Sequence, residues 1–342
     1  MPDLTSRKGQ ILRIIVNDYV STAAPVPSNA VVRSGLGVCS ATVRNEMVAL
    51  EETGYILRPH ISSGGVPSDK GYRYFVNALD PMARITPQDA ALLQTEMAHA
   101  GADFEAWTEA ASSALADLLG ALAFATPPRA PAATVKGLDL LKLQELIIMV
   151  VVVLREASVH RQIITLDRPV SAAELEHARN RLSEAVTGKS AREVEAAVPA
   201  VTDHFEHQVM ESTAGVLRKH EAAALGEPVF QGLGKLFDQP EFATNPEQAR
   251  NVVAAMERSE LFASLAGQAP DDGGPVIIIG SENRHEGLRD FSVIICRYGI
   301  PEEAQGLVGL IGPTRMPYER AVPLVRHAAS SLGDITARVY GG

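Results

Sequence analysis

The residues with the most suggestive chemistry lie in the stretch SATVRNEMVALEETGYI at positions 40–56. If this stretch is a helix, one apolar stripe has the spacing of a buried face and consists of Val43, Met47 and Leu50. The opposite face carries Arg44 and Asn45 among small residues, where a solvated face usually carries long charged side chains. Guanidinium and amide groups can hydrogen-bond to base edges in the major groove of DNA. The pattern predicts a DNA-contacting face, with an ordinary solvated face as the alternative.

The surrounding sequence predicts the elements that would position this face. Ser6 can cap a first helix, and Ser28 opens a second, shorter one. Ser40 is expected to start the third helix and cap it with its side chain, and Gly54 ends that helix. A strand (YILRPH), a Gly-rich reversal (ISSGGVPS) and a return element around residues 70–75 follow. Three helices followed by these elements predict a winged helix-turn-helix.

Candidate DNA contacts lie on the third helix and in the wing. Small side chains on the helix permit close approach to the groove, and its N-terminus suits a phosphate oxygen. Short polar groups beside glycines in the wing can meet phosphates, although a soluble turn is the alternative there. At least one ring among the aromatic residues at 72, 74 and 75 is expected in the core. The candidate residues are Ser40, Ala41, Thr42, Arg44, Asn45, His60, Ser62, Ser63, Gly64, Lys70 and Arg73.

Composition and charge are compatible with this interpretation. The 342 residues are 46% hydrophobic and 21% charged, which is typical of a globular protein of two or three domains. The net charge of −10 would repel nucleic acid if it were spread evenly. Residues 1–79, however, carry eight Lys or Arg and six Asp or Glu, a balance of +2 that leaves −12 for the rest. A mildly basic N-terminal segment followed by an acidic remainder fits a DNA-binding module attached to a regulatory domain.

The cysteines and the apolar runs indicate a cytoplasmic protein with no membrane association. Cys39 and Cys296 are the only cysteines, and their separation argues against disulfides and a zinc cluster. We expect Cys39 to be a buried thiol. The longest apolar run, LIIMVVVVL, is about half of a membrane span and predicts a buried strand.

The run SATVRNEMVALEETGYILRPHISSGGVPSDKGYRYFV resembles the N-terminal domain of HrcA, a family of bacterial heat-inducible transcription repressors. LDRPVSAAELEHARNRLSE, GLGKLFDQPEF, IIIGSEN and GLIGPTRMPYERAVPLV resemble further HrcA segments in the same order. This resemblance implies a winged helix, a GAF-like domain and an inserted dimerising domain. It also implies a repressor that binds, as a homodimer, an inverted-repeat operator called CIRCE upstream of chaperone operons such as groE and dnaK. The GroEL chaperonin would promote the active repressor, and heating would relieve repression.

Two positions depart from the family pattern. Gly65 stands where the family commonly has Arg, so a minor-groove or phosphate contact from that residue is not available. Cys39 stands where Ser is usual.

The expected fold class is α+β, with an N-terminal winged helix-turn-helix, a GAF-like α/β sheet domain and a helical dimerisation insert. Thr86 and Pro87 start a helix, Ser171 and Glu174 form a capping box, and a last helix follows Pro317. The stretch ELIIMVVVVLREASVHRQIITL predicts two strands, which we assign to the sheet of the GAF-like domain. The first strand is expected in the middle of its sheet. The expected segments are 1–85 for the winged helix, 86–170 and 230–342 for the GAF-like domain, and 171–229 for the insert.

The remaining chemical signals are weak. His204 and His207 have the i, i+3 spacing of two metal ligands, but further ligands are missing and a surface helix is expected. The run GLGK at 232–235 lacks the other parts of a phosphate loop and predicts a plain turn. The segment GLIGPTR at 309–315 either lines a ligand pocket or is a strand followed by a turn. With no nucleophile, base and orienting residue in evidence, we expect neither an enzyme nor a cofactor.

Three functional hypotheses follow. The first is a dimeric repressor of chaperone operons. The alternative is a winged-helix regulator controlled by a small molecule in the GAF-like domain. The third is an interaction protein whose winged helix docks protein instead of DNA.

Overall fold

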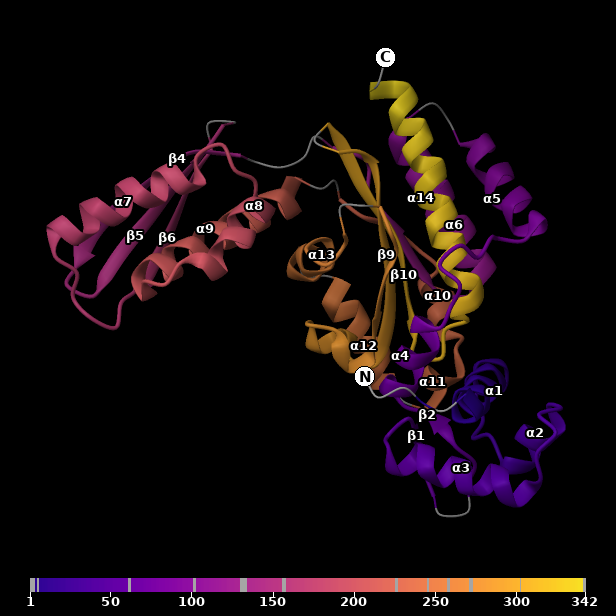
Figure 1. The fold of residues 1–342 in the computed structure, drawn as a ribbon. Helices are drawn as coiled ribbons and strands as arrows, with labels where there is room; N and C mark the ends of the chain where they lie inside the picture. Colours follow the sequence, from indigo (N-terminus) through magenta and orange to yellow (C-terminus); the bar gives the residue numbers. More distant parts are fainter. Residues whose placement is uncertain are drawn as a thin grey trace. The chain divides into compact units, whose positions relative to one another are not determined.

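The computed structural model describes a mixed α+β chain that divides into two compact units (Figure 1). Among the described helices, none combines the length and the apolar character needed to cross a membrane. Unit 1 comprises residues 1–127, 227–299 and 306–342, and unit 2 comprises residues 128–226 and 300–305. The described residues are 4, 6–60, 63–100, 103–129, 134–155, 158–224, 227–244, 246–256, 259–270, 273–301 and 303–340.

Unit 1 begins with three helices and a short hairpin. The helices are α1 (Ser6–Thr22), α2 (Ser28–Arg33) and α3 (Ser40–Glu52). The hairpin pairs β1 (Ile56–Leu57) with β2 (Val66–Pro67) in antiparallel register. The predicted apolar stripe of α3 is confirmed, because its three residues are at most 2% exposed.

Two local predictions for this segment are wrong. The residue that caps α3 is Cys39, whose extended backbone precedes the helix, and Ser40 is already the first helical residue. Residues 70–75 belong to a helix, α4 (Asp69–Asn77), so the returning strand is β2. The helix forms because Ser68 caps it, with its hydroxyl accepting a hydrogen bond from Gly71 N at 3.1 Å.

A five-stranded sheet forms the larger part of unit 1. Its order is β7-β3-β10-β9-β8. Three of the pairings, β7 with β3, β3 with β10 and β8 with β9, are antiparallel. The strands are β3 (Leu122–Ala125), β7 (Val229–Gln231), β8 (Val276–Ile279), β9 (Phe291–Ile300) and β10 (Ala304–Pro313).

Helices cover both faces of this sheet (Figure 1). On one face lie α5 (Pro87–His99), α6 (Phe104–Leu119) and α14 (Tyr318–Tyr340), and on the other lie α12 (Pro246–Met256) and α13 (Ser259–Ala266). Two short helices, α10 (Leu233–Phe237) and α11 (Pro240–Thr244), follow β7. Thr86 caps α5 as predicted, and α14 begins directly after Pro317.

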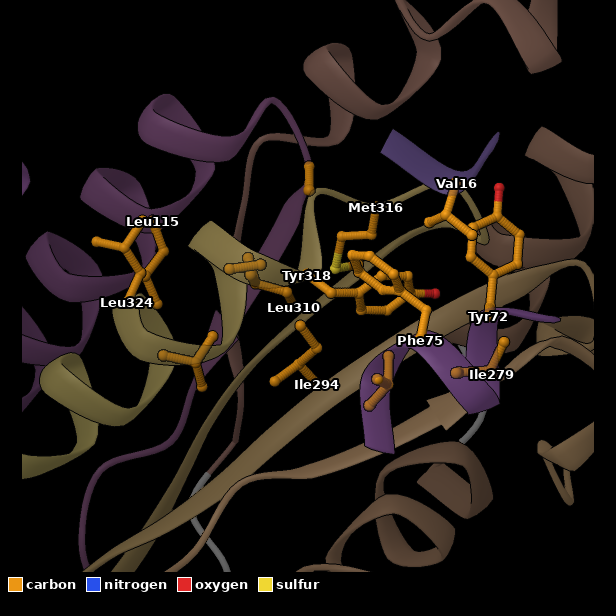
Figure 2. Close-up of a cluster of buried hydrophobic side chains, with 14 of the residues drawn as sticks. Val16, Tyr72, Phe75, Leu115, Ile279, Ile294, Leu310, Met316, Tyr318 and Leu324 are labelled. Carbon is orange, nitrogen blue, oxygen red and sulfur yellow. The ribbon is translucent and has the colours of Figure 1, made fainter. Parts of the chain in front are cut away.

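One apolar core joins the N-terminal helices to the sheet (Figure 2). Tyr72 and Phe75 of α4 are buried, as expected for at least one ring of this segment, and the ring centroids of Tyr72 and Tyr318 are 5.9 Å apart. Leu115 of α6 and Leu324 of α14 belong to the same core. The N-terminal helices and the sheet of unit 1 therefore share one hydrophobic interior.

The described residues of unit 2 form a separate three-stranded sheet and three α-helices. Its strands are β4 (Val135–Gln144), β5 (Ile147–Leu154) and β6 (Val159–Thr165), with β5 in the middle. The helices are α7 (Ala172–Val186), α8 (Ala191–Ala197) and α9 (His204–Ala224), with a 3-10 turn at Val198–Ala200. The capping box of Ser171 and Glu174 is present at the start of α7.

This arrangement corrects the expected position of the apolar strands. The strand in LIIMVVVVL is central, as predicted, but it lies in the sheet of unit 2 and not in the sheet that contains β9 and β10. The second compact unit begins at residue 128, upstream of the helix that was expected to open the insert at residue 171. Apolar periodicity marks a buried strand, but the pairing partner that decides its sheet lies elsewhere in the chain.

Gly71 provides a test of the packing around α4. A Cβ at Gly71 would overlap the backbone carbonyl of Tyr55, whereas a Cβ at Gly234 of α10 meets no atom within 4 Å. We expect Gly71→Ala to lower the free energy of unfolding by about 1–3 kcal/mol. Gly234→Ala should be neutral or raise it by up to about 1 kcal/mol, because alanine favours helix. Urea denaturation, followed by the fluorescence of Trp107 in unit 1, measures the free energy of unfolding of each variant. Equal changes in this free energy for the two variants would contradict the prediction.

Candidate nucleic-acid interface

The outward face of α3 carries Ala41, Arg44, Asn45 and Val48, and all four are exposed. Because the opposite stripe is buried against the core, these side chains must point away from the protein. Among the described residues, no carboxylate forms an ion pair with Arg44. The guanidinium and the neighbouring amide are therefore free to meet a ligand.

The first turn of α3 differs from the prediction at Cys39. This thiol is exposed and not buried, because the residue that caps α3 stands outside the core. Its Sγ lies 3.2 Å from the hydroxyl of Thr42, and the hydrogen bond to Thr42 lowers the pKa of the thiol. Ser40 and Thr42 are half-buried beside it.

The turn of the hairpin carries the predicted wing residues. The Ser63 hydroxyl donates to His60 O at 2.7 Å and accepts from His60 N at 3.0 Å, so it closes the turn. A Cβ at Gly64 would overlap the backbone of Val26, and this close approach requires glycine. Ser62, also predicted as a contact, lies outside the described residues.

Gly65 occupies a more buried place than the sequence suggests. Its backbone exchanges two hydrogen bonds of 2.9 Å with Val26. A Cβ at this position would lie 2.9 Å from Ile56 Cδ1 and 3.2 Å from Met47 Cε, both in the core. A longer side chain at position 65 would first have to displace these two residues.

The α3 face and the hairpin meet at an open pocket of about 210 Å³. The pocket brings Arg44 together with Ser63 and Gly64, as the sequence predicts, and adds Arg58 and Ser28, which the sequence analysis missed. Arg58 lies within the predicted strand YILRPH. Its position close to the predicted wing is the signal from which this contact could have been predicted. The guanidinium groups and the Ser28 hydroxyl around this open pocket provide donors for a phosphate. The remaining lining residues are Pro27 and Met47.

Lys70 and Arg73 are not brought to this pocket. The Lys70 ammonium donates to Thr53 O at 2.7 Å and lies 4.3 Å from the centroid of the Tyr55 ring. Arg73 Nε donates to Glu282 Oε1 at 2.8 Å, and its Nη2 donates to Ile277 O at 2.6 Å. Both side chains therefore make hydrogen bonds within the protein, and Arg73 attaches α4 to the sheet part of unit 1.

A second carboxylate contact completes the attachment of α4. Asp69 accepts hydrogen bonds from the backbone N of Ser281 at 2.8 Å and from its hydroxyl at 2.7 Å. We call the contacts of Asp69 and Arg73 with Ser281, Glu282 and Ile277 the α4 clasp. The clasp joins the DKGYRYF and IIIGSEN motifs, which lie more than 200 residues apart.

The weaker signals are explained by local contacts. His204 and His207 lie on α9, where His204 Nε2 is 2.9 Å from Asp167 Oδ2 and His207 Nδ1 is 3.9 Å from Glu211 Oε2. The described residues contain no group of three or more His, Cys, Asp or Glu side chains that could hold a metal. Lys235, from the GLGK run, forms an ion pair with Asp117.

The segment at 309–315 is a packed strand end. A Cβ at Gly309 would overlap Ile294 O, and one at Gly312 would lie 2.9 Å from Met316 Cε. Arg315 binds Glu241 and donates to Gln239 Oε1 at 2.6 Å. These contacts favour the strand-and-turn interpretation over a pocket lining.

Comparisons with known proteins agree with these motifs. A family model described as "HrcA protein C terminal domain" matches residues 105–322. The chain is 37% identical over 339 residues to the heat-inducible transcription repressor HrcA of Dehalococcoides mccartyi strain CBDB1, covering 99% of this chain and 97% of the relative. It is 33% identical to HrcA of Herpetosiphon aurantiacus, with the same coverage. A crystal structure of a hypothetical protein matches the fold with a TM-score of 0.62 at 23% identity, covering 98% of this chain and 99% of the other.

Proposed function

The chain belongs to the HrcA family of heat-inducible transcription repressors, and from this premise we propose that it represses transcription by binding double-stranded DNA through α3 and the hairpin. In this proposal, residues 6–77 form a winged helix-turn-helix and the five-stranded sheet belongs to a GAF-like domain. The target is an inverted-repeat operator of the CIRCE type upstream of chaperone operons such as groE and dnaK. Repression takes place in the cytoplasm.

The observation that carries the proposal is the division of α3 into two faces. Its buried stripe anchors the helix, and its exposed face presents Arg44 and Asn45 beside the small Ala41. A major groove about 12 Å wide admits one helix, and these two side chains have donors and acceptors that match base edges. Ser40 and Thr42 lie at the N-terminal end of α3, where backbone N–H groups face a phosphate.

The wing has the complementary role of holding the DNA backbone. His60, Ser63 and Gly64 lie in the turn, and Arg58 and Arg44 line the adjoining pocket. Contacts to phosphate fix the position of a protein on the duplex, while base contacts provide specificity. We therefore assign Arg44 and Asn45 to base recognition and Arg58, on the hairpin side of the pocket, to a phosphate.

Arg44 provides the direct test. We expect Arg44→Ala to weaken operator binding by about 1–3 kcal/mol and to relax specificity at one base pair, because a guanidinium contact to a base edge is lost. Binding by the unaltered protein should fall steeply with salt as phosphate contacts release counterions. Mobility-shift titrations at several salt concentrations measure both effects.

Arg289 supplies the matched control, since it is an exposed arginine in the sheet part of unit 1. Arg289→Ala should leave operator affinity unchanged. An Arg44→Ala protein that is folded and binds the operator with full affinity would disprove the assigned role. A flat salt response would disprove DNA binding through phosphates.

We propose that the repressor is a homodimer joined through the sheet of unit 2. One face of this sheet packs against the helices of the unit, with Val150 and Val152 of β5 buried. The strand register places Leu141, Met149 and Ile163 in one row on the other face, where Leu141 is 46% and Ile163 is 58% exposed. An apolar sheet face of this kind is typical of an interaction surface.

The charges on this open face favour a second copy of the chain as the partner. Asp139 and Arg161 are exposed and flank Val151 on opposite sides of β5, and Asp139 Oδ1 lies 4.0 Å from Arg179 Nη1 of the same chain. A twofold axis that runs parallel to β5 above Val151 brings Asp139 of one copy to Arg161 of the other. Such self-complementarity is typical of a symmetric interface. A dimer also suits an inverted repeat, because each copy meets one half-site.

Ile163 tests the dimer. We expect Ile163→Asp to raise the dimer dissociation constant by roughly 10- to 100-fold, because a buried isoleucine contributes about 1.5–3 kcal/mol. Asn180→Asp adds the same charge at an exposed position of α7 and should leave the dimer intact. Sedimentation equilibrium distinguishes the two variants. Equal dissociation constants for all three proteins would refute an interface on this face.

We propose further that GroEL promotes the active form and that heating removes it, which rests on membership of the family. Operator binding by the purified protein should fall after brief heating and recover when GroEL is added. The measurement is the fraction of operator bound with and without GroEL, before and after heating. Binding that is insensitive to both treatments would contradict this regulation.

A further inference from the structure

Val48 is an apolar side chain on the face of α3 that is proposed to enter DNA. It is 41% exposed, whereas Val43, Met47 and Leu50 of the same helix are at most 2% exposed. Val48 therefore contributes little to the core that anchors α3. Its exposed position is explained if the side chain meets a ligand.

The position of Val48 relies on helix geometry. It follows Arg44 by four residues and Asn45 by three, and residues at these spacings are neighbours on one helix surface. A rise of about 1.5 Å per residue places Val48 about 6 Å beyond Arg44 along the axis. Successive bases on one strand are about 3.4 Å apart, so Val48 faces a base roughly two steps from the one that Arg44 reads.

The chemistry of the side chain selects its partner. Valine has no hydrogen-bond donor or acceptor beyond the backbone, and the apolar group that bases present in the major groove is the C5-methyl of thymine. Branching at Cβ holds the two methyl groups of valine in one preferred rotamer, so little entropy is lost on contact.

We propose that Val48 is a specificity-determining residue that packs against the C5-methyl group of a thymine in each half-site. This inference rests on the proposed DNA-binding role of α3. It adds an apolar contact to a face that otherwise reads bases through Arg44 and Asn45, and it predicts discrimination of thymine from cytosine at one position.

Replacing thymine by deoxyuridine removes only the methyl group and tests the contact. In each operator duplex, the thymine at one position of the repeat is replaced by deoxyuridine in both half-sites. Each duplex is then titrated with the full-length protein. We expect one replacement, within about two base pairs of the position at which Arg44→Ala relaxes specificity, to weaken binding by about three- to tenfold. Val48→Ser should bind the thymine and deoxyuridine duplexes equally, and Val48→Thr, which keeps one methyl, should retain part of the discrimination.

Met82 supplies a control for loss of an exposed apolar side chain, since it is 80% exposed and lies after α4. Met82→Ser should show the same methyl dependence as the unaltered protein. If the unaltered protein binds the operator but tolerates deoxyuridine at every thymine, or if Val48→Ser keeps the full discrimination, this inference is wrong and the repressor function stands. If the unaltered protein does not bind the operator at all, the proposed function fails and this inference fails with it.

Discussion

The burial of one stripe of α3 decides where every proposed base-contacting group points. With Val43, Met47 and Leu50 fixed in the core, helical geometry leaves Arg44 and Asn45 on the opposite side. The hairpin depends on the same core, because Met47 lies beneath Gly65 and also lines the pocket with Arg44. One apolar contact surface therefore sets both the exposed face of the helix and the position of the wing beside it.

The same core extends from the N-terminal helices into the sheet of unit 1. Tyr72 of α4 contacts Tyr318 at the start of α14, and the Tyr318 hydroxyl lies 2.6 Å from that of Ser292. The α4 clasp adds the polar contacts of Asp69 and Arg73 around this ring pair. Because apolar and polar contacts act together, α4 is held to the sheet as well as to the hairpin. A change in packing at Tyr318 would thus be transmitted to the hairpin through α4.

Features encoded within a few residues were predicted well from the sequence, and features that depend on distant partners were not. The stripe of α3 and the caps at Thr86 and Ser171 follow from neighbouring residues. The strand at 147–154 was recognised as central, but apolar content cannot identify which sheet supplies its partners. Arg73 looked available because its partner Glu282 lies 209 residues away. Cys39 looked buried because a small apolar thiol usually is, whereas its place outside the first turn of α3 exposes it.

Gly65, where the resemblance to the family implies an arginine, has a structural role in the folded hairpin. The backbone of Gly65 is paired with Val26, and its α-carbon faces Ile56 and Met47, so in this chain position 65 supports the hairpin from inside. The cations near the turn are Arg44 and Arg58, which approach the same pocket from the helix and from the end of β1. Arg58 is held 3.2 Å from Glu51, and a phosphate in the pocket would compete with that carboxylate. In the proposed binding mode, the backbone contact therefore comes from Arg58, which precedes the turn, and a glycine within the turn is compatible with DNA binding.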